Sequence, residues 1–339
     1  MMELYPLKMM PFYRHGSATP WGGNALRELF GKDTPDNQTG ESLEISGFPT
    51  TPSSIANGEL AGKTLPEVVA LWGKQLTGLD AGGEFPLMLK LIDAHDMLSL
   101  QVHPGDEYAG LHENGKLGKT EAWVILSAPH GAELVYGVNC DKDELKRAID
   151  ENDLERALRF VRVVPGDVLY IPHGMVHALG SGIIIYEIQQ SSDVTYRFWD
   201  WGRTDAQGKP RELHMDKAFD VTNCALSEGK LSGATVIVEG GSQTAYISDE
   251  NFELWRLNVA GKMPLQSGRM LFLTPLGPCK LSWPGGVMEL NPLDSVLVPA
   301  GLDGAVIKGR LPVLMSTTPD AESLRAQLGY RADAIAGLK

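Results

Sequence analysis

The stretch LSLQVHP, residues 98–104, carries two polar side chains, Gln101 and His103, inside an apolar run. Side chains of a β-strand alternate between its two faces, so residues two apart share one face. If this run is a strand, Gln101 and His103 point the same way among neighbours typical of a protein core. Burying two polar groups costs free energy unless each has a partner, and a bound cation would compensate both.

Two more polar residues extend this set. Glu121 lies in KTEAWVIL at the start of the next apolar strand, and His177 follows the corner IPHGMVHALG. If antiparallel connections bring these segments together, two imidazoles, a carboxylate and an amide oxygen converge. Such mixed nitrogen and oxygen ligands suit zinc, manganese or iron, and ligands from one side only leave a coordination position for substrate or water.

The same residues also fit a structure without a metal. His103 is then part of a capped loop after a strand, Glu121 is a solvated strand end, and His177 is a hydrogen-bonded core histidine. His173 is close enough to His177 in the sequence to compete as a ligand. Residue chemistry alone leaves the two interpretations open.

The elements that must position these residues are mostly short strands separated by Gly, Pro and Asp turns. The apolar patterns predict strands at 86–92, 98–103, 120–126, 133–138, 167–171 and 182–190, and over most of 232–316. Helical spacing predicts helices at 64–78, 142–160 and 211–226. Many short strands at this spacing predict an all-β protein, a sandwich or jelly roll with a few helical additions.

Two segments of the chain resemble each other. Residues 165–180 align without gaps on residues 292–307, matching Pro165 to Pro292 and Asp167 to Asp294, and both predict a turn, a strand and a Pro-x-Gly corner. This similarity predicts two related sheet domains, 1–230 and 231–339, with 227–233 as the linker. At the position of His177 the second copy has Gly304, so the second domain is expected to bind no metal there.

Composition limits the possible partners. The chain has 339 residues, 43% of them hydrophobic, and a formal net charge of -13. An acidic protein is poorly suited to nucleic acid or an anionic membrane, and an anionic substrate would need a local basic pocket. Three separated cysteines indicate neither a disulfide framework nor a cysteine metal site, and no apolar stretch approaches the length of a membrane span. We therefore expect a soluble, cytoplasmic protein; its oligomeric state is not indicated.

Four motifs in order along the chain carry a family resemblance. The segments FPLMLKLIDAHDMLSLQVHPGDEYA, GKTEAWVIL, IPHGMVHALG and QQSSDVTYRFWDWGR resemble the motif series of type I phosphomannose isomerases, and WGGNALRELFG and TGESLEISG resemble that family's opening segments. The similarity runs from about Trp21 to Arg203 and is weak beyond 230. Members of this family are metal-dependent cupins that interconvert mannose 6-phosphate and fructose 6-phosphate.

The resemblance implies an all-β fold of two cupin (jelly-roll) domains, a sugar-phosphate substrate and a role for each motif residue. One zinc ion per chain, or another divalent metal, would be held by Gln101, His103, Glu121 and His177. Catalytic positions would fall on Arg197, Lys119 and Glu187, and substrate-binding positions on Ser99 and Lys90. Beside the resemblance, residue chemistry adds Arg203 to the substrate-binding candidates, because Arg197 with Lys90 or Arg203 could hold the phosphate by charge-assisted hydrogen bonds. Two departures from the family pattern, His173 and the FWDW stretch, concern substrate fit and not the ligand positions.

The reaction implied is proton transfer between C1 and C2 through a cis-enediol. Negative charge develops on oxygen, which a divalent cation can stabilise, and a positioned base must move the proton. Glu187 and Lys119 are the candidates for proton handling, in an order that the sequence leaves open. Two other classes remain: a cupin metalloenzyme of different chemistry, such as an iron oxygenase, and a sugar-binding cupin without turnover. Gln101 as a fourth ligand disfavours the first, and the retention of all four ligands disfavours the second.

Overall fold

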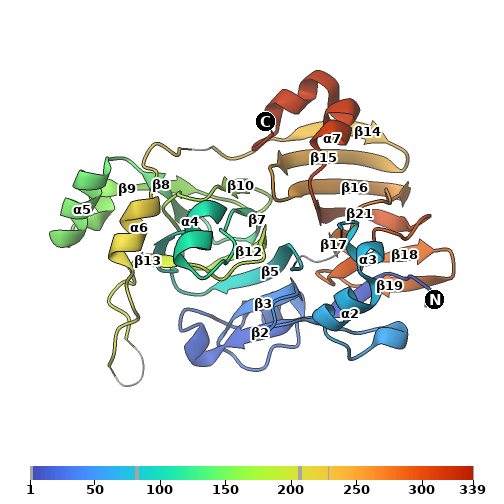
Figure 1. Ribbon diagram of the computed structural model, residues 1–339, viewed down its shortest axis with the longest axis horizontal. Helices are drawn as coiled ribbons and strands as arrows, with labels where there is room; N and C mark the ends of the chain where they lie inside the picture. The colour runs from blue at the N-terminus through green and yellow to red at the C-terminus, as the bar shows by residue number, and fades with distance from the viewer. Residues whose placement is uncertain (1–2, 81–83, 205–207, 228, 339) are drawn as a thin grey trace. The chain divides into compact units, whose positions relative to one another are not determined.

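The computed structural model describes residues 3–80, 84–204, 208–227 and 229–338 (Figure 1). The chain forms two compact units. We call residues 13–42 and 90–230 the central unit, and residues 1–12, 43–89 and 231–339 the flanking unit. The predicted boundary between domains 1–230 and 231–339 coincides with one boundary between these units, at residues 230 and 231. The division of the chain into those two domains stays a prediction.

The central unit is built on two sheets. One has the strand order β10-β7-β12-β5-β3-β2, in which β3 and β5 also run into the flanking unit, and the other has the order β13-β6-β11-β8-β9. The bounds of the first are β2 Phe12–His15, β3 Thr39–Ser46, β5 Leu87–Ala94, β7 Glu121–Ser127, β10 Val168–Ile171 and β12 Ile183–Gln190. Those of the second are β6 Leu100–Val102, β8 Glu133–Val138, β9 Leu158–Arg162, β11 His177–Ala178 and β13 Tyr196–Trp199.

The flanking unit holds a ten-stranded sheet. Its order is β14-β15-β16-β21-β17-β20-β1-β4, with β18 paired to β19 and β21. The bounds are β1 Leu7–Met10, β4 Ser54–Ile55, β14 Ala234–Val238, β15 Gly241–Ser248, β16 Glu253–Pro264, β17 Leu271–Pro275, β18 Cys279–Trp283, β19 Gly286–Leu290, β20 Val296–Val298 and β21 Val306–Thr317. The prevalence of strands confirms a β-rich protein with helical additions, as the sequence predicts.

Helices begin and end where local chemistry favours it. They are α1 Ala25–Phe30, α2 Leu65–Trp72, α3 Lys74–Thr77, α4 Asp106–His112, α5 Lys142–Asp150, α6 Met215–Val221 and α7 Ala321–Leu328. A capping box of Thr64 and Glu67 starts α2, and Gly73, at φ +48, separates it from α3 within the predicted helix 64–78. Helix α6 occupies part of the predicted helix 211–226 and packs against β13 and β6 (Figure 1).

The helix predicted over 142–160 is wrong in its second half. Asp141 caps α5 by accepting a hydrogen bond from the Glu144 amide, but the helix ends at Asp150. Asn152 then takes a left-handed conformation at φ +55, and residues 158–162 form β9 against β8. Helical spacing continues through this segment, yet pairing with a distant strand satisfies its backbone better than continued helix does.

The two similar segments fold in the same way. Asp167 Oδ2 accepts a hydrogen bond from the Val164 amide, and Asp294 Oδ2 accepts one from the Asn291 amide, three residues back in each case. The short strands β10 and β20 follow these turns. The matched aspartates therefore close equivalent turns, which supports the predicted internal repeat.

Apolar side chains of each unit form their own clusters. In the central unit one cluster includes Trp123, Leu169 and Ile185, whereas the flanking unit has a cluster around Trp255, Leu273 and Val313. No helix in the described part of the chain is long and apolar enough to cross a membrane. Residues 227 and 229–233 of the predicted linker contain neither helix nor strand, and residue 228 lies outside the described residues.

Candidate active site

Strand β6 places two predicted site residues beside a third. The Cα of Gln101 on β6 pairs with His177 on β11 at one side and with Arg197 on β13 at the other. Glu121 is the first residue of β7, where it pairs with Ile171 of β10 and Gln189 of β12. Antiparallel pairing thus brings together residues that are 50 to 96 positions apart in the sequence, as the sequence interpretation requires.

Backbone contacts fix the loops that carry the other site residues. The Gly174 amide, in the corner before β11, donates to the His103 carbonyl oxygen at 2.9 Å, and the Lys119 amide donates to the Pro104 oxygen at 2.9 Å. Gly174 adopts φ +83, which favours glycine. A Cβ on Gly118 would come within 2.5 Å of the Gly105 carbonyl carbon, so only glycine allows the Lys119 loop to approach so closely.

Three buried side chains form a candidate metal centre. Ligand atoms of His103, Glu121 and His177 all lie within 4.8 Å of one another. His103 Nε2 is 3.2 Å from Glu121 Oε1, and His177 Nε2 is 3.9 Å from Glu121 Oε2. The competing ligand His173 is exposed, lies against Gly105 and is not part of this cluster.

The two histidines are oriented as metal ligands commonly are. Nδ1 of His103 donates to the Val194 oxygen at 2.9 Å, and Nδ1 of His177 donates to the Met175 oxygen at 2.9 Å. A bond of this kind fixes the tautomer and leaves the Nε2 lone pair free for a cation. Both Nε2 atoms are the ones that face Glu121.

The protonation states also fit a cation. Burial, reinforced by the positive charge of Lys119, lowers the pKa of His103 to about 3, and the same two causes lower the pKa of His177. Burial by itself would raise the pKa of Glu121, but Lys119 and His103 outweigh it and hold that pKa well below the ordinary value. Two neutral imidazoles and one carboxylate are a donor set suited to a divalent metal.

Gln101 lies beside this centre, and its side-chain amide nitrogen, not its oxygen, faces His177. Its Nε2 is 3.3 Å from His177 Nε2, while Ser99 Oγ donates to its Oε1 at 3.5 Å. Ligation through Oε1 needs a half-turn of the terminal amide. The Ser99 hydroxyl can accept as well as donate, so it can bond the amide in either orientation.

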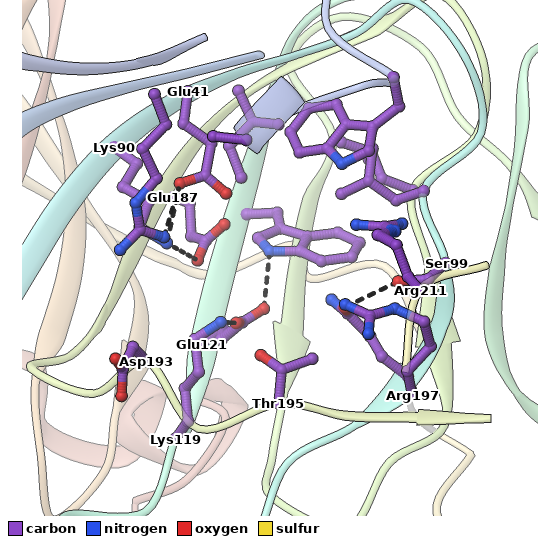
Figure 2. A pocket seen from close by; sticks show the side chains of 18 residues that line it. Glu41, Lys90, Ser99, Lys119, Glu121, Glu187, Asp193, Thr195, Arg197 and Arg211 are labelled. Carbon is purple, nitrogen blue, oxygen red and sulfur yellow. Dashed lines mark hydrogen bonds and ion pairs between the residues drawn. The ribbon is translucent and has the colours of Figure 1, made fainter. Parts of the chain in front are cut away.

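A polar cavity of about 280 Å³ opens over the metal centre. Its lining, within the described part of the chain, includes the predicted residues Lys90, Ser99, Gln101, Lys119, Glu121, Glu187 and Arg197. Figure 2 shows Lys90 between the carboxylates of Glu41 and Glu187 on one side of Glu121, and Arg197 with Arg211 on the other. Lys90 Nζ is 3.8 Å from Glu41 Oε2 and 4.0 Å from Glu187 Oε1.

The pKa values of Glu187 and Lys119 are both raised in this cavity. Burial, followed by repulsion from Glu121, raises the pKa of Glu187 to about 8. Burial alone would lower the pKa of Lys119, but attraction to Glu121 and Glu187 raises it. The Lys119 ammonium lies 2.5 Å from Glu121 Oε1. Such perturbed groups in a cavity are typical of proton-transfer sites.

In the part of the chain that the structure describes, Arg203 is the one predicted site residue that neither lines the cavity nor belongs to the metal centre. Its guanidinium donates to Asp200 and to the Met97 oxygen instead. Sequence reasoning also missed Arg14, Glu41, Trp123 and Arg211, which line the cavity. The spacing of Glu121 and Trp123 contained a signal, because residues two apart share a strand face and the Trp123 indole donates to Glu121 Oε2 at 3.1 Å.

Comparison with known proteins gives a consistent result. The family described as phosphomannose isomerase type I, catalytic domain, matches residues 11–151. Mannose-6-phosphate isomerase ManA of Bacillus subtilis is 36% identical over 320 residues, 93% of this chain and 99% of that protein. Mannose-6-phosphate isomerase of Streptococcus mutans is 42% identical over 250 residues, 73% of this chain and 77% of that protein. The crystal structure of the mannose 6-phosphate isomerase from Bacillus subtilis superimposes with a TM-score of 0.86 at 35% identity, covering 92% of this chain and 99% of that one.

Proposed function

Because the chain belongs to the type I phosphomannose isomerases, which interconvert mannose 6-phosphate and fructose 6-phosphate, we propose that the cavity of the central unit is the site of this reaction. The observation that carries the proposal is the cluster of His103, Glu121 and His177 beside a cavity that holds both acidic and basic side chains. Metal ligands, perturbed acids and an arginine pair are the parts that isomerisation of an anionic sugar requires.

The metal of the proposed enzyme is one zinc ion per chain, although other divalent ions suit the same ligands. His103, Glu121 and His177 would hold it, with Gln101 as fourth ligand after its amide turns. A divalent cation bound there would polarise a carbonyl and stabilise negative charge on oxygen.

The second domain, residues 231–339, is proposed to be a metal-free cupin and the first, residues 1–230, a metal-binding one. Gly304, which replaces His177 in the repeat, has no side chain to coordinate a metal. The pairing of β10 with β7 matches that of β20 with β17, and it puts Leu271 where the first domain has Glu121. Two ligand positions are therefore lost together.

Proton transfer between C1 and C2 is assigned to Glu187 and Lys119. The raised pKa of Glu187, caused by burial and by Glu121, makes this carboxylate a stronger base than a solvated one. Lys119 is held as a cation by its carboxylate neighbours and can donate a hydrogen bond to a developing enediolate oxygen. The Lys90 ammonium, 4.0 Å from Glu187 Oε1, favours the charged carboxylate and so limits the rise of its pKa.

Arg197 and Ser99 are proposed to bind the substrate away from the reacting carbons. Both line the cavity, on the side opposite Lys90 and Glu187 in Figure 2. A guanidinium suits phosphate because it offers parallel donors of fixed geometry. A substrate-binding role for Arg203 stays a prediction from its place near Arg197 in the sequence.

The function is tested by a coupled assay on mannose 6-phosphate, run on the protein as purified, after chelation and after zinc is added back. We expect activity to disappear on chelation and return with zinc, and metal analysis to find one tightly bound ion per chain. Full activity in the metal-free protein, or two tight ions per chain, would contradict the proposal. Oxygen uptake without isomerisation would favour the oxygenase alternative, and sugar binding without turnover the non-catalytic one.

The proposed substrate partner is a small sugar phosphate. The cytoplasmic location and the absence of nucleic-acid and membrane partners stay predictions from the acidic composition.

A further inference from the structure

The side chain of Arg211 reaches the cavity from a segment that sequence reasoning did not single out. Two of its nitrogens are already engaged: Nε donates to Asp200 Oδ2 at 2.6 Å and Nη2 to Asp200 Oδ1 at 2.5 Å. Its Nη1 has no acceptor among the described residues. A guanidinium clamped along one edge in this way presents its remaining donors in a fixed direction.

Asp200 holds more than one arginine. It is buried, and its Oδ1 also accepts from Arg203 Nη2 at 2.5 Å. Burial by itself would raise the pKa of Asp200, but the hydrogen bonds from Arg211 and Arg203 outweigh it and lower that pKa. Arg203 in turn donates to the Met97 oxygen at 2.5 Å, so Asp200 is fixed relative to the loop that leads into β6.

Arg197 lies next to Arg211 because the chain after Arg211 folds onto β13. Arg197 Nη1 donates to the Glu212 oxygen at 2.8 Å, and the His214 amide donates to the Arg197 oxygen at 2.9 Å. Burial, followed by repulsion from Arg211, lowers the pKa of Arg197. Figure 2 shows the two guanidinium groups together at one end of the cavity, beside Ser99.

The charges at this end do not balance. Among the described residues, Asp200 is the one buried carboxylate near the guanidinium groups of Arg197, Arg203 and Arg211, so these groups carry an excess of two positive charges. Of the nearby carboxylates, Asp193 pairs with Lys116 and the Glu212 side chain is 83% exposed. Two adjacent guanidinium groups with free donors and an excess of two positive charges complement a phosphate dianion.

We propose that Arg211 binds the phosphate of the substrate together with Arg197, and that Asp200 is a positioning residue that aims Arg211 into the cavity. This inference rests on the proposed function, because it assigns a phosphate to the substrate of that site. The phosphate role predicted for Arg203 then belongs to Arg211. Arg203 instead holds Asp200 in place through its bonds to Asp200 and to the Met97 oxygen.

Two measurements on the zinc-loaded protein test the assignment. The first is the steady-state kinetics of mannose 6-phosphate with competitive inhibition by inorganic phosphate, and the second is calorimetric binding of inorganic phosphate without sugar. Arg211→Ala should raise KM and weaken phosphate binding by about ten- to a hundredfold, since one charge-assisted contact is lost, while kcat changes less than about threefold. Arg211→Lys keeps the charge but not the fork, and should fall between wild type and Arg211→Ala.

Asp200→Asn tests the positioning role. It should raise KM and the phosphate inhibition constant together, by less than Arg211→Ala does, with kcat and zinc content retained. A fall in kcat and zinc content at unchanged phosphate affinity would mean that Asp200 is only structural. Arg162→Ala is the matched control, because its guanidinium pairs with Glu133 on the surface of the same unit and should change neither constant.

Wild-type KM and phosphate affinity in folded Arg211→Ala would overturn the proposal, and so would a larger loss in Arg203→Ala. The calorimetric arm separates this failure from failure of the proposed function. If the wild type binds phosphate through Arg211 but does not isomerise mannose 6-phosphate, the isomerase proposal is wrong while the phosphate site stands.

Discussion

Strands β7, β10 and β12 of the central unit and strands β17, β20 and β21 of the flanking unit pair in the same register. Glu121 pairs with Ile171 and Gln189 in the first set, as Leu271 pairs with Val298 and Thr317 in the second. The backbones are equivalent, and the side chains are not. A polar centre occupies one set, and apolar packing occupies the other.

Three replacements contribute to the difference. Leu271 stands for Glu121, Met315 stands for Glu187 by its pairing with Leu273, and Gly304 stands for His177 in the repeated segment. The cavity beside Leu271 and Met315 has a volume of about 20 Å³, against about 280 Å³ beside Glu121 and Glu187. About 20 Å³ has room for roughly one water molecule, so the flanking unit has closed the space that the central unit keeps open.

A buried carboxylate persists in the flanking unit, but the protein alone compensates it. The Trp255 indole donates to Glu253 Oε2 at 2.9 Å, Arg269 pairs with the same oxygen at 3.0 Å, and the Asp320 amide donates to Oε1 at 2.8 Å. Glu121 has the same indole bond, from Trp123, but faces two imidazoles. The comparison teaches that a Glu-x-Trp pair marks a buried carboxylate and that its other neighbours decide whether a metal can bind.

Removing a histidine ligand from the central unit should have the largest effect on zinc binding and activity. His103→Ala or His177→Ala should lose bound zinc and at least about a thousandfold in activity, because each takes away a ligand and not merely its orientation. Metal analysis and the coupled assay check both losses on the same sample. His130→Ala is the control, since His130 is exposed and outside the cluster; stoichiometric zinc in both ligand variants would contradict the assignment.

Arg197 lies on β13, the strand that follows β12 in the central unit. The flanking unit has no equivalent strand, because helix α7 follows β21 there. If Arg197 binds the phosphate as proposed, Arg197→Ala should raise KM by about ten- to a hundredfold at nearly constant kcat, with zinc retained. Arg197→Lys should recover part of the loss. Steady-state kinetics decide between roles: a kcat lowered by about a hundred- to a thousandfold, or about 2.7 to 4 kcal/mol, would indicate contact with charge that develops in the transition state, and wild-type kinetics would remove Arg197 from the site.

The two Glu-x-Trp pairs give a matched experiment. Trp123→Phe should weaken zinc affinity by about ten- to a hundredfold, because the indole bond orients a ligating carboxylate. Trp255→Phe removes the same kind of bond at Glu253 and should leave zinc affinity unchanged, with a cost of about 1 to 3 kcal/mol in the free energy of unfolding. Competition with a zinc chelator measures the first, and urea denaturation the second. Equal zinc affinities in the two variants would show that the indole bond does not tune the metal centre.

The smallest expected effect concerns pH. Burial and Glu121 raise the pKa of Glu187 to about 8, above its value in the unfolded chain, so the folded metal-free protein binds the extra proton. The stability from that proton is complete below about pH 4.5 and is lost as the pH rises to 8. Glu187→Gln should flatten this pH dependence in urea denaturation of the metal-free protein. Exposed Glu155→Gln should keep the wild-type slope, and a wild-type slope in Glu187→Gln would contradict the prediction.

The sequence predicted the strands that carry the site because their patterns are local. Strands predicted at 98–103, 120–126 and 182–190 are confirmed as β6, β7 and β12, and side-chain alternation put Gln101 and His103 on one face. The second half of the helix predicted at 142–160 shows the limit of local patterns. Residues 158–162 form a strand because they pair with β8, and the spacing of apolar residues gives no sign of that pairing.

The sequence by itself determined the donor types, the turns and the missing histidine at Gly304, since each depends on residue identity or on neighbours within a few positions. Only the tertiary structure decided which charges share the cavity. Arg203 and Arg211 both follow the FWDW stretch and both pair with Asp200. Arg203 nevertheless donates to the Met97 oxygen, whereas Arg211 lines the cavity. Glu41 and Lys90 are 49 positions apart in the chain and meet across a sheet. Such encounters depend on strand order and loop packing, whose free energies are summed over distant residues and leave no periodic signal in the sequence.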